Sequence, residues 1–303
     1  MPFTRLAEFG VLVFGFALAI GCGKKPEAVP DVVVAPNSTP GEDADKAAKA
    51  EALRRLRVIG KALDRGSVQN FVSDFPAGFD DTKGQPLLSW RVVILPYLGP
   101  DEAKLYEQFK LNEPWDSEHN KKLIARMPKI FESPGKAAPE GKTYLRSFVG
   151  EMAIIPPPAP GNAFPNESPG VPNFLRRRRI RDVTDGTALT LAVAEATEPV
   201  EWTKPDELAF PSARGGPTPP VPKLGGPFPG GFHGLTCDGA AHFFPATLSE
   251  KTLRAMITIN GGEVLDKDAY DALGQGIQLT PPINNPPKEI PAKGGKKVEY
   301  GGK

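Results

Sequence analysis

The feature that most constrains the fold is an amphipathic segment at residues 43–65, which is the clearest helix in the sequence. Its apolar residues recur at helical spacing and form a single stripe. That stripe consists of Ala52, Leu56, Ile59 and Leu63. A helix with one apolar stripe faces a core through that stripe. The sequence therefore predicts a long helix that ends at Gly66 and packs on the remainder of the folded part.

Basic residues follow another face of the same segment: Arg54, Arg57, Lys61 and Arg65. Such a face is normally a solvated helix surface. An alternative is contact with anionic lipid headgroups, if this part of the chain lies near a membrane.

The segments after this helix predict β-strands and short helices. Residues 88–98 (LSWRVVILPYL) are strongly apolar, so they indicate a buried strand or a passage from strand to helix. We expect strands at 143–149 and 189–194, and a hairpin at 232–244 that turns at Asp238 and Gly239. A further helix is predicted at 247–257, with Thr247 and Glu250 spaced as a capping box. The order favours the α+β class, with the long N-terminal helix packed on an antiparallel sheet.

Other segments are expected to be irregular. The chain contains 35 proline and 32 glycine residues, which is typical of long Pro/Gly-rich loops. Residues 70–84 carry turn chemistry, including Phe75-Pro76-Ala77-Gly78. The basic run at 176–181 is expected to be a solvated loop, and the alternative is a patch that binds acidic cell-wall or lipid groups. The formal net charge of +1 gives no general attraction to nucleic acid, so no nucleic-acid partner is expected.

The start of the chain predicts where the protein resides. An apolar run at 11–20 is followed by Gly21 and Cys22. The run is shorter than the ~20 residues of a membrane-spanning helix, and it has the layout of a signal peptide. The end of the run, Leu18-Ala19-Ile20-Gly21-Cys22, resembles the lipobox of a bacterial lipoprotein. Cys22 would then be the mature N-terminus and carry acyl chains such as palmitate. The alternative is an ordinary secretory signal cleaved elsewhere, with an incidental cysteine.

We therefore expect four regions. Residues 1–21 form a lipoprotein signal peptide, and residues 22–42 form a flexible tether. Residues 43–273 form one globular domain. Residues 274–303, rich in Pro, Gly, Lys and Asn, form a disordered tail. The expected location is extracytoplasmic, anchored to a bacterial membrane through Cys22, and the choice between inner and outer membrane stays open.

Candidate chemistry in the sequence is weak. His233, Cys237 and His242 lie in the predicted hairpin, and His with Cys is a zinc-like ligand set. Asp238, however, is expected to form the hairpin turn with Gly239. His242 need not lie on the face of the hairpin that carries His233 and Cys237, so no metal site is predicted. There is no nucleophile elbow and no phosphate-binding loop, and we expect neither an enzyme nor a cofactor. Cys237 is expected to be a buried small apolar residue.

Several short segments together resemble one family. They include LRVIGKAL at 56–63, SWRVVILPYL at 89–98, EPWDSEHNKK at 113–122, DVTDGT at 182–187, Glu195-Ala196, PGGF at 229–232 and NGGE at 260–263. In this order, across roughly residues 53–264, they are similar to the bacterial envelope family known as domain of unknown function 1559. The resemblance implies a prepilin-like, or pseudopilin-like, fold and an envelope setting, without an activity.

The chain departs from that family at both ends. A lipobox stands where typical members carry a prepilin leader. The closing H-x9-DG motif keeps Asp238 and Gly239, but Phe228 occupies the His position. His233 is not its equivalent.

Three functions remain open. The first is a lipid-anchored, non-catalytic envelope protein that presents an interaction surface to an envelope protein or cell-wall partner. The second is a solute-binding lipoprotein, in which aromatic residues line a pocket, although core packing explains those residues better; they are Trp90, Trp115, Trp202, Tyr97 and Tyr106. The third is a metal-dependent hydrolase that uses the hairpin histidines.

Overall fold

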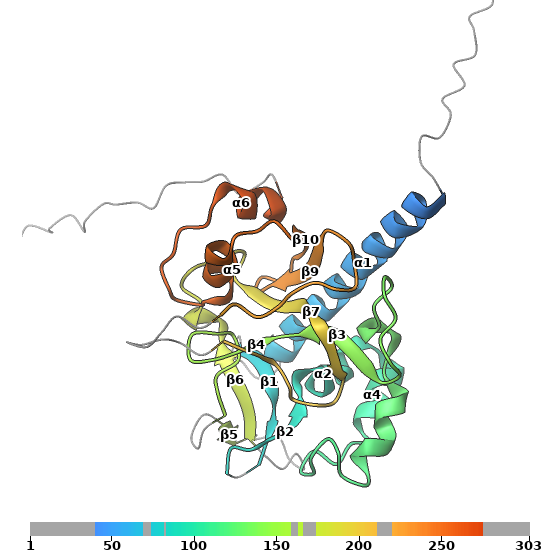
Figure 1. Cartoon of the computed structure of the whole chain (residues 1–303). Helices are drawn as coiled ribbons and strands as arrows, with labels where there is room; N and C mark the ends of the chain where they lie inside the picture. Colours follow the sequence, from blue (N-terminus) through green and yellow to red (C-terminus); the bar gives the residue numbers. More distant parts are fainter. Residues whose placement is uncertain are drawn as a thin grey trace, which may run out of the picture. The chain divides into compact units, whose positions relative to one another are not determined.

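The computed structural model describes residues 40–68, 74–81, 83–158, 163–165, 174–210 and 220–274. Cys22, the predicted signal peptide, the tether up to residue 39 and the tail from residue 275 lie outside the described residues. The described part is a mixed α and β fold with antiparallel sheets and a long helix, α1 (Pro40–Val68), at its N-terminal end (Figure 1). None of the helices in the described ranges combines the length and the apolarity needed to span a bilayer.

Helix α1 confirms the amphipathic prediction. It begins three residues before the predicted start, at Pro40, a residue type favoured in the first helical turn. The whole predicted stripe is buried: Ala52, Leu56, Ile59 and Leu63. The predicted end was wrong, because α1 continues through Gly66 to Val68. The helix contacts β1 of one sheet and β9 and β10 of another. In Figure 1 it passes β10 and β9 and ends near β1.

The first sheet has the strand order β2-β1-β6-β5. Its strands are β2 (Pro86–Ser89), β1 (Asp74–Asp80), β6 (Phe174–Arg179) and β5 (Ala163–Pro165), and all neighbours are antiparallel. Two predictions were wrong here. The expected turn at Phe75-Pro76-Ala77-Gly78 is a central strand, and residues 176–179 of the expected basic loop form most of β6.

A β-bulge reconciles β1 with its turn-like sequence. The register between β1 and β6 shifts between Pro76 and Gly78, and bulges are where a central strand accommodates proline. Gly78 has φ +142°, and a Cβ there would lie 2.5 Å from the carbonyl oxygen of Leu88. Residues that favour turns in isolation are therefore held in a strand by its two neighbours.

The second sheet has the strand order β10-β9-β7-β3 and is also antiparallel. Its strands are β3 (Lys142–Arg146), β7 (Leu191–Glu201), β9 (Gly231–Thr236) and β10 (Ala241–Pro245). They confirm the predicted strand near 143–149, the strand at 189–194 and the hairpin. A short parallel pair joins β4 (Phe148–Val149) to β8 (Leu208–Ala209).

Short helices connect and cover the sheets. Residues 88–98 form the predicted passage from strand to helix, with β2 followed by α2 (Trp90–Val93) and α3 (Leu95–Leu98). Next come α4 (Pro100–Tyr106) and the 3-10 helices η1 (Asn120–Arg126), η2 (Lys129–Phe131) and η3 (Ile180–Asp182). The C-terminal part adds α5 (Glu250–Ile257) and α6 (Lys267–Leu273). The predicted capping box at α5 was wrong, because Ser249 is the N-cap and its Oγ accepts the N–H of Thr252 at 3.0 Å.

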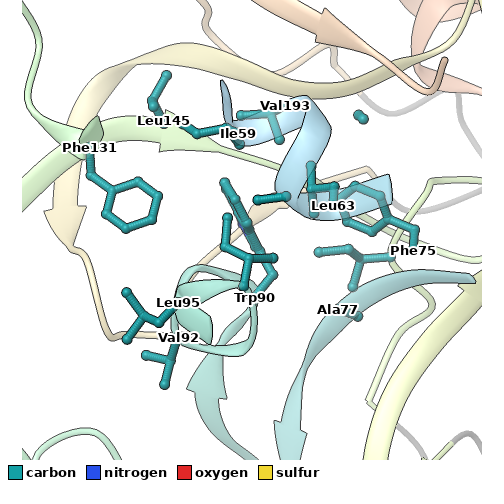
Figure 2. Close-up of a cluster of buried hydrophobic side chains, with 14 of the residues drawn as sticks. Ile59, Leu63, Phe75, Ala77, Trp90, Val92, Leu95, Phe131, Leu145 and Val193 are labelled. Atoms are coloured by element: carbon teal, nitrogen blue, oxygen red, sulfur yellow. The ribbon is translucent and has the colours of Figure 1, made fainter. Parts of the chain in front are cut away.

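The larger hydrophobic core joins α1 to both four-stranded sheets. Figure 2 shows Ile59 and Leu63 of α1 facing Phe75 of β1, Trp90 of α2 and Val193 of β7. A second cluster packs residues of α5 and α6 with residues of β7, β9 and β10. This arrangement places the C-terminal half of α1 next to the end of the β9–β10 hairpin, where the candidate site lies.

Candidate functional site

A cavity of about 230 Å³ lies where α1 meets the turn of the β9–β10 hairpin. We call it the DG cavity, because Asp238 and Gly239 form part of its wall. Its lining comes from segments far apart in the sequence: Gly60, Leu63, Asp64, Asp74, Phe75, Ile180, Thr187, Ala192, Leu235, Thr236, Cys237, Asp238 and Gly239. The cavity thus exists only once the helix, both large sheets and η3 are assembled.

The turn at Asp238 and Gly239 is held firmly in place. The Asp238 carboxylate accepts the Thr236 hydroxyl at 2.6 Å and the backbone N–H of Ala240 at 3.0 Å. Gly239 has φ +84°, a backbone conformation that favours glycine. The backbone N–H groups of Cys237 and Asp238 donate to carbonyls in the 187–190 segment, at 2.8 Å and 3.1 Å. These bonds make this wall of the cavity rigid.

Helix α1 approaches the same turn very closely at Gly60. A Cβ at Gly60 would lie 2.7 Å from the carbonyl oxygen of Gly239 and 3.0 Å from a methyl carbon of Leu235. Only a residue without a side chain permits this contact. Gly60 therefore sets the distance between the helix and the hairpin turn, and with it the width of the cavity.

The lining combines an apolar floor with carboxylates. Leu63, Phe75, Ala192 and Leu235 are each less than 8% exposed and supply hydrocarbon. Asp64 and Asp238 are exposed, and Asp74 is buried. The described lining contains no Lys, Arg or His side chain. Within the described residues, no group of three or more His, Cys, Asp or Glu is placed to hold a metal ion.

Cys237 lines the cavity as a free, half-buried cysteine. Burial raises the pKa of its thiol well above the usual range, and the nearby Asp238 carboxylate raises it further. The thiolate is the reactive form of cysteine. Because the thiol stays protonated near neutral pH, Cys237 behaves as a small apolar part of the wall.

His233 lies on the inner face of β9 and is held by a carboxylate that sequence reasoning did not pair with it. Its Nδ1 lies 2.9 Å from Glu195 Oε2, which also accepts the His233 backbone N–H at 2.8 Å. Both side chains are buried, and the rings of Phe228 and Phe243 contact the imidazole with centroids 4.5 Å and 4.9 Å away. The residue in the motif-His position, Phe228, thus packs edge-on against His233.

The structure does not bring the three candidate metal ligands together. In the β9–β10 register His233 is opposite Phe243, whereas His242 is opposite Gly234, so the two histidines point to opposite faces of the hairpin. His242 is half-buried, and burial lowers its pKa, as does Arg57, whereas Asp238 raises it. Cys237 belongs to the turn beyond β9.

The aromatic residues considered as a pocket lining form no part of the DG cavity. Trp90 and Trp202 are fully buried and pack on Phe131, with Phe109 edge-on to Trp202 at 5.7 Å. Trp115, Tyr97 and Tyr106 are partly buried against the same core. The preferred interpretation of these residues as core is therefore confirmed.

Sequence reasoning missed Gly60, Asp64, Asp74 and Glu195 as neighbours of the hairpin. One signal was present for Gly60. A glycine in the middle of an amphipathic helix lowers helix stability, and a close packing contact is the usual reason for it. The carboxylates gave no local signal, because their relation to the hairpin arises only from the tertiary fold.

Fold and cavity together define a mixed α and β protein with antiparallel sheets, one long N-terminal helix and a cavity at the contact between helix and hairpin. The sequence matches the model of a family, SBP_bac_10, described as "Protein of unknown function (DUF1559)", over residues 67–219, about half of the chain. The chain belongs to this family, which confirms the resemblance found in the sequence. Neither a curated protein nor a solved structure matches the chain.

The matched range is narrower than the resemblance, which extends over roughly residues 53–264. It contains β1, the strand-to-helix passage at 88–98 and Glu195. Gly60 and Asp64 precede it, and Asp238 and Gly239 follow it. The DG cavity is therefore built partly from the matched region and partly from segments on either side of it.

Proposed function

We propose that the protein is a lipid-anchored, non-catalytic component of the bacterial cell envelope whose folded part presents an interaction surface. The observation that carries this proposal is the apolar run at 11–20 followed by Gly21-Cys22. A short apolar run ending in small residues before a cysteine is what a lipobox requires, and acyl chains on Cys22 would hold the protein at a membrane.

The environment of the candidate reactive groups supports a non-catalytic role. His233 is enclosed by Glu195, Phe228 and Phe243, and the thiol of Cys237 is kept protonated by burial. A general base or nucleophile must reach the reacting atom within hydrogen-bond distance. In the described part of the chain, these groups serve the packing of the hairpin instead.

Mass spectrometry of protein isolated from cells tests the anchor directly. We expect the mature chain to begin at Cys22 with acyl chains on its sulfur and amine. Cys22→Ser should move the protein from the detergent phase to the aqueous phase in a phase-separation assay. Cys237→Ser is the matched control and should stay in the detergent phase. An unmodified Cys22 in cell-derived material, or recovery of the native protein with cytosolic proteins, would refute the anchor.

The interaction surface is tested by crosslinking in intact cells. We expect a cell-envelope component to be captured by the full-length protein and lost when Cys22→Ser removes it from the membrane. A purified protein that binds no envelope component and turns over a substrate would contradict the non-catalytic assignment.

A second candidate function, solute binding, is favoured by the DG cavity. Its volume of about 230 Å³ is just below the ~300–1,000 Å³ of drug-sized sites, which suits a smaller ligand. A thermal-shift screen of small solutes tests this function, since a ligand that binds only the folded state raises Tm.

The finer fold class is also part of this proposal. Contact of α1 with β9, β10 and β1 supports a pilin-like arrangement, in which an N-terminal helix packs on an antiparallel sheet. In this chain a lipid on Cys22 would replace the apolar leader as the membrane attachment.

A further inference from the structure

We propose that the DG cavity binds a small organic cation, namely an amine with a short hydrocarbon body. This inference rests on the second candidate function, solute binding, and it names the chemical class of the solute.

The floor of the cavity calls for a hydrocarbon part in the ligand. Leu63 of α1, Phe75 of β1 and Leu235 of β9 are buried core residues that also line the cavity. Transfer of apolar surface from water onto such a floor is favourable. A bare ion would leave this surface without a partner, whereas an alkyl chain of a few carbons would cover it.

The charge of the lining calls for a cationic group. Asp64 and Asp238 are exposed, so their carboxylates mark the solvent side of the cavity. The described lining includes no basic side chain that would attract an anion. A cavity with one sign of charge and low-dielectric walls raises the local concentration of ligands of the opposite sign.

The geometry favours an organic cation over a metal ion. A metal site needs several ligand atoms around one point, and no group of three His, Cys, Asp or Glu in the described residues offers that arrangement. Carboxylates distributed along a partly apolar cavity fit an ammonium group whose alkyl body lies on the floor.

The rigidity of the wall makes the cavity suited to binding. The Asp238 carboxylate oxygen that accepts the Thr236 hydroxyl and the Ala240 N–H is fixed by those two bonds. A preformed site loses little conformational entropy when a ligand enters. A carboxylate fixed in this way holds its negative charge at a defined position in the cavity wall.

Isothermal titration calorimetry on the purified full-length protein in a nonionic detergent tests the proposal. The probes are n-butylamine and 1,5-diaminopentane. Butyrate and 1-butanol are matched controls, since they keep the hydrocarbon body while reversing or removing the charge. Magnesium chloride tests for a simple ion. We expect at least one of the two amines to bind, and all three control solutes to bind at least about tenfold more weakly than that amine.

Two conservative variants locate the binding. Asp64→Asn removes an exposed charge, and Asp238→Asn removes a charge while keeping an acceptor oxygen and a turn-forming residue. Each should raise the Kd of the amine about two- to fivefold, as expected for a partly exposed ion pair. Asp101→Asn, an exposed carboxylate at the start of α4 paired with Lys104, is the matched control and should leave Kd unchanged. Thr187→Trp should fill the cavity and abolish binding.

The outcomes separate this inference from the function on which it rests. If butyrate, butanol or magnesium binds as tightly as the amine, the cation assignment is overturned while solute binding stands. If an amine binds and none of the three cavity variants weakens it, the assignment to the DG cavity is overturned. If no probe binds and a broad thermal-shift screen also finds no ligand, both the inference and solute binding fail.

Discussion

Replacing Gly60 by alanine tests the contact that shapes the candidate site. In an isolated helix this change is stabilising, because glycine is the poorer helix former by about 0.5–1 kcal/mol. In the folded protein the new Cβ would meet the backbone oxygen of Gly239 at 2.7 Å and the Cα of the same residue at 3.1 Å. The obstacle is backbone held by the hairpin turn, so it cannot rotate away as a flexible side chain could.

The gain in helix propensity and the steric clash oppose each other, and their magnitudes decide whether Gly60→Ala raises or lowers the free energy of unfolding. Overpacking a well-packed core typically costs about 1–3 kcal/mol. The improved helix propensity offsets about 0.5–1 kcal/mol of that cost. We therefore expect Gly60→Ala to lower the free energy of unfolding by about 1–2 kcal/mol, and to lower Tm by about 2–8 °C for a domain of this size.

Thermal and urea unfolding, followed by circular dichroism, measure this change. Gly41→Ala is the matched control, because Gly41 lies in the same helix and a Cβ there meets no atom within 4 Å. It should be neutral or slightly stabilising. The reasoning fails if Gly60→Ala is as stable as the native protein or more stable, because α1 and the hairpin turn would then not be in tight contact.

Two further predictions concern a buried ion pair and a titrating residue. Arg91→Leu leaves the buried Glu207 carboxylate, which lies 3.0 Å from the guanidinium, without its charge partner, and should cost about 3–5 kcal/mol in urea unfolding. Arg54→Leu removes an exposed ion pair that solvent screens, so it should cost far less, and equal losses would contradict this reasoning. Burial lowers the pKa of His242 below the ordinary 6.5, so the unfolded state binds the proton first; its contribution to stability is present above pH 6.5 and is lost as the pH falls below it. His242→Phe should therefore flatten the decrease in Tm with acidification in that window, and an unchanged slope would refute this origin.

Local sequence patterns were sufficient to predict elements whose conformation is favoured by residues close together in the sequence. The stripe of Leu56, Ile59 and Leu63 requires a helix with one buried face, and α1 buries it. The Asp238-Gly239 pair favours a tight turn, and Asp238 bonds within that turn. These predictions depend on contacts between residues close in the sequence, so they hold before the rest of the chain is placed.

Local patterns failed where neighbouring strands decide the conformation. Residues 75–78 favour a turn by composition, yet they form β1 because β2 and β6 supply backbone partners on both sides. The arginines of β6 were likewise expected in a solvated loop from their composition, but pairing with β1 places them in a strand. Arg178, for example, is half-buried and donates to the carbonyl of Glu151 at 2.9 Å. Propensity is a weak prior when sheet pairing satisfies the backbone.

By itself, the sequence determined the amphipathic helix and the hairpin, because each of these depends on a short run of residues. It also indicated the family, through several short segments whose order is kept across roughly residues 53–264. The tertiary structure alone decided that Gly60 touches Gly239, that Glu195 holds His233, and that three aspartates from distant segments share one cavity. Such juxtapositions depend on long-range packing, in which residues far apart in the chain become neighbours only after the apolar surfaces are buried together. The turn at Asp238 and Gly239 could be predicted locally, but its assembly with α1 and β1 into the DG cavity belongs to this second group.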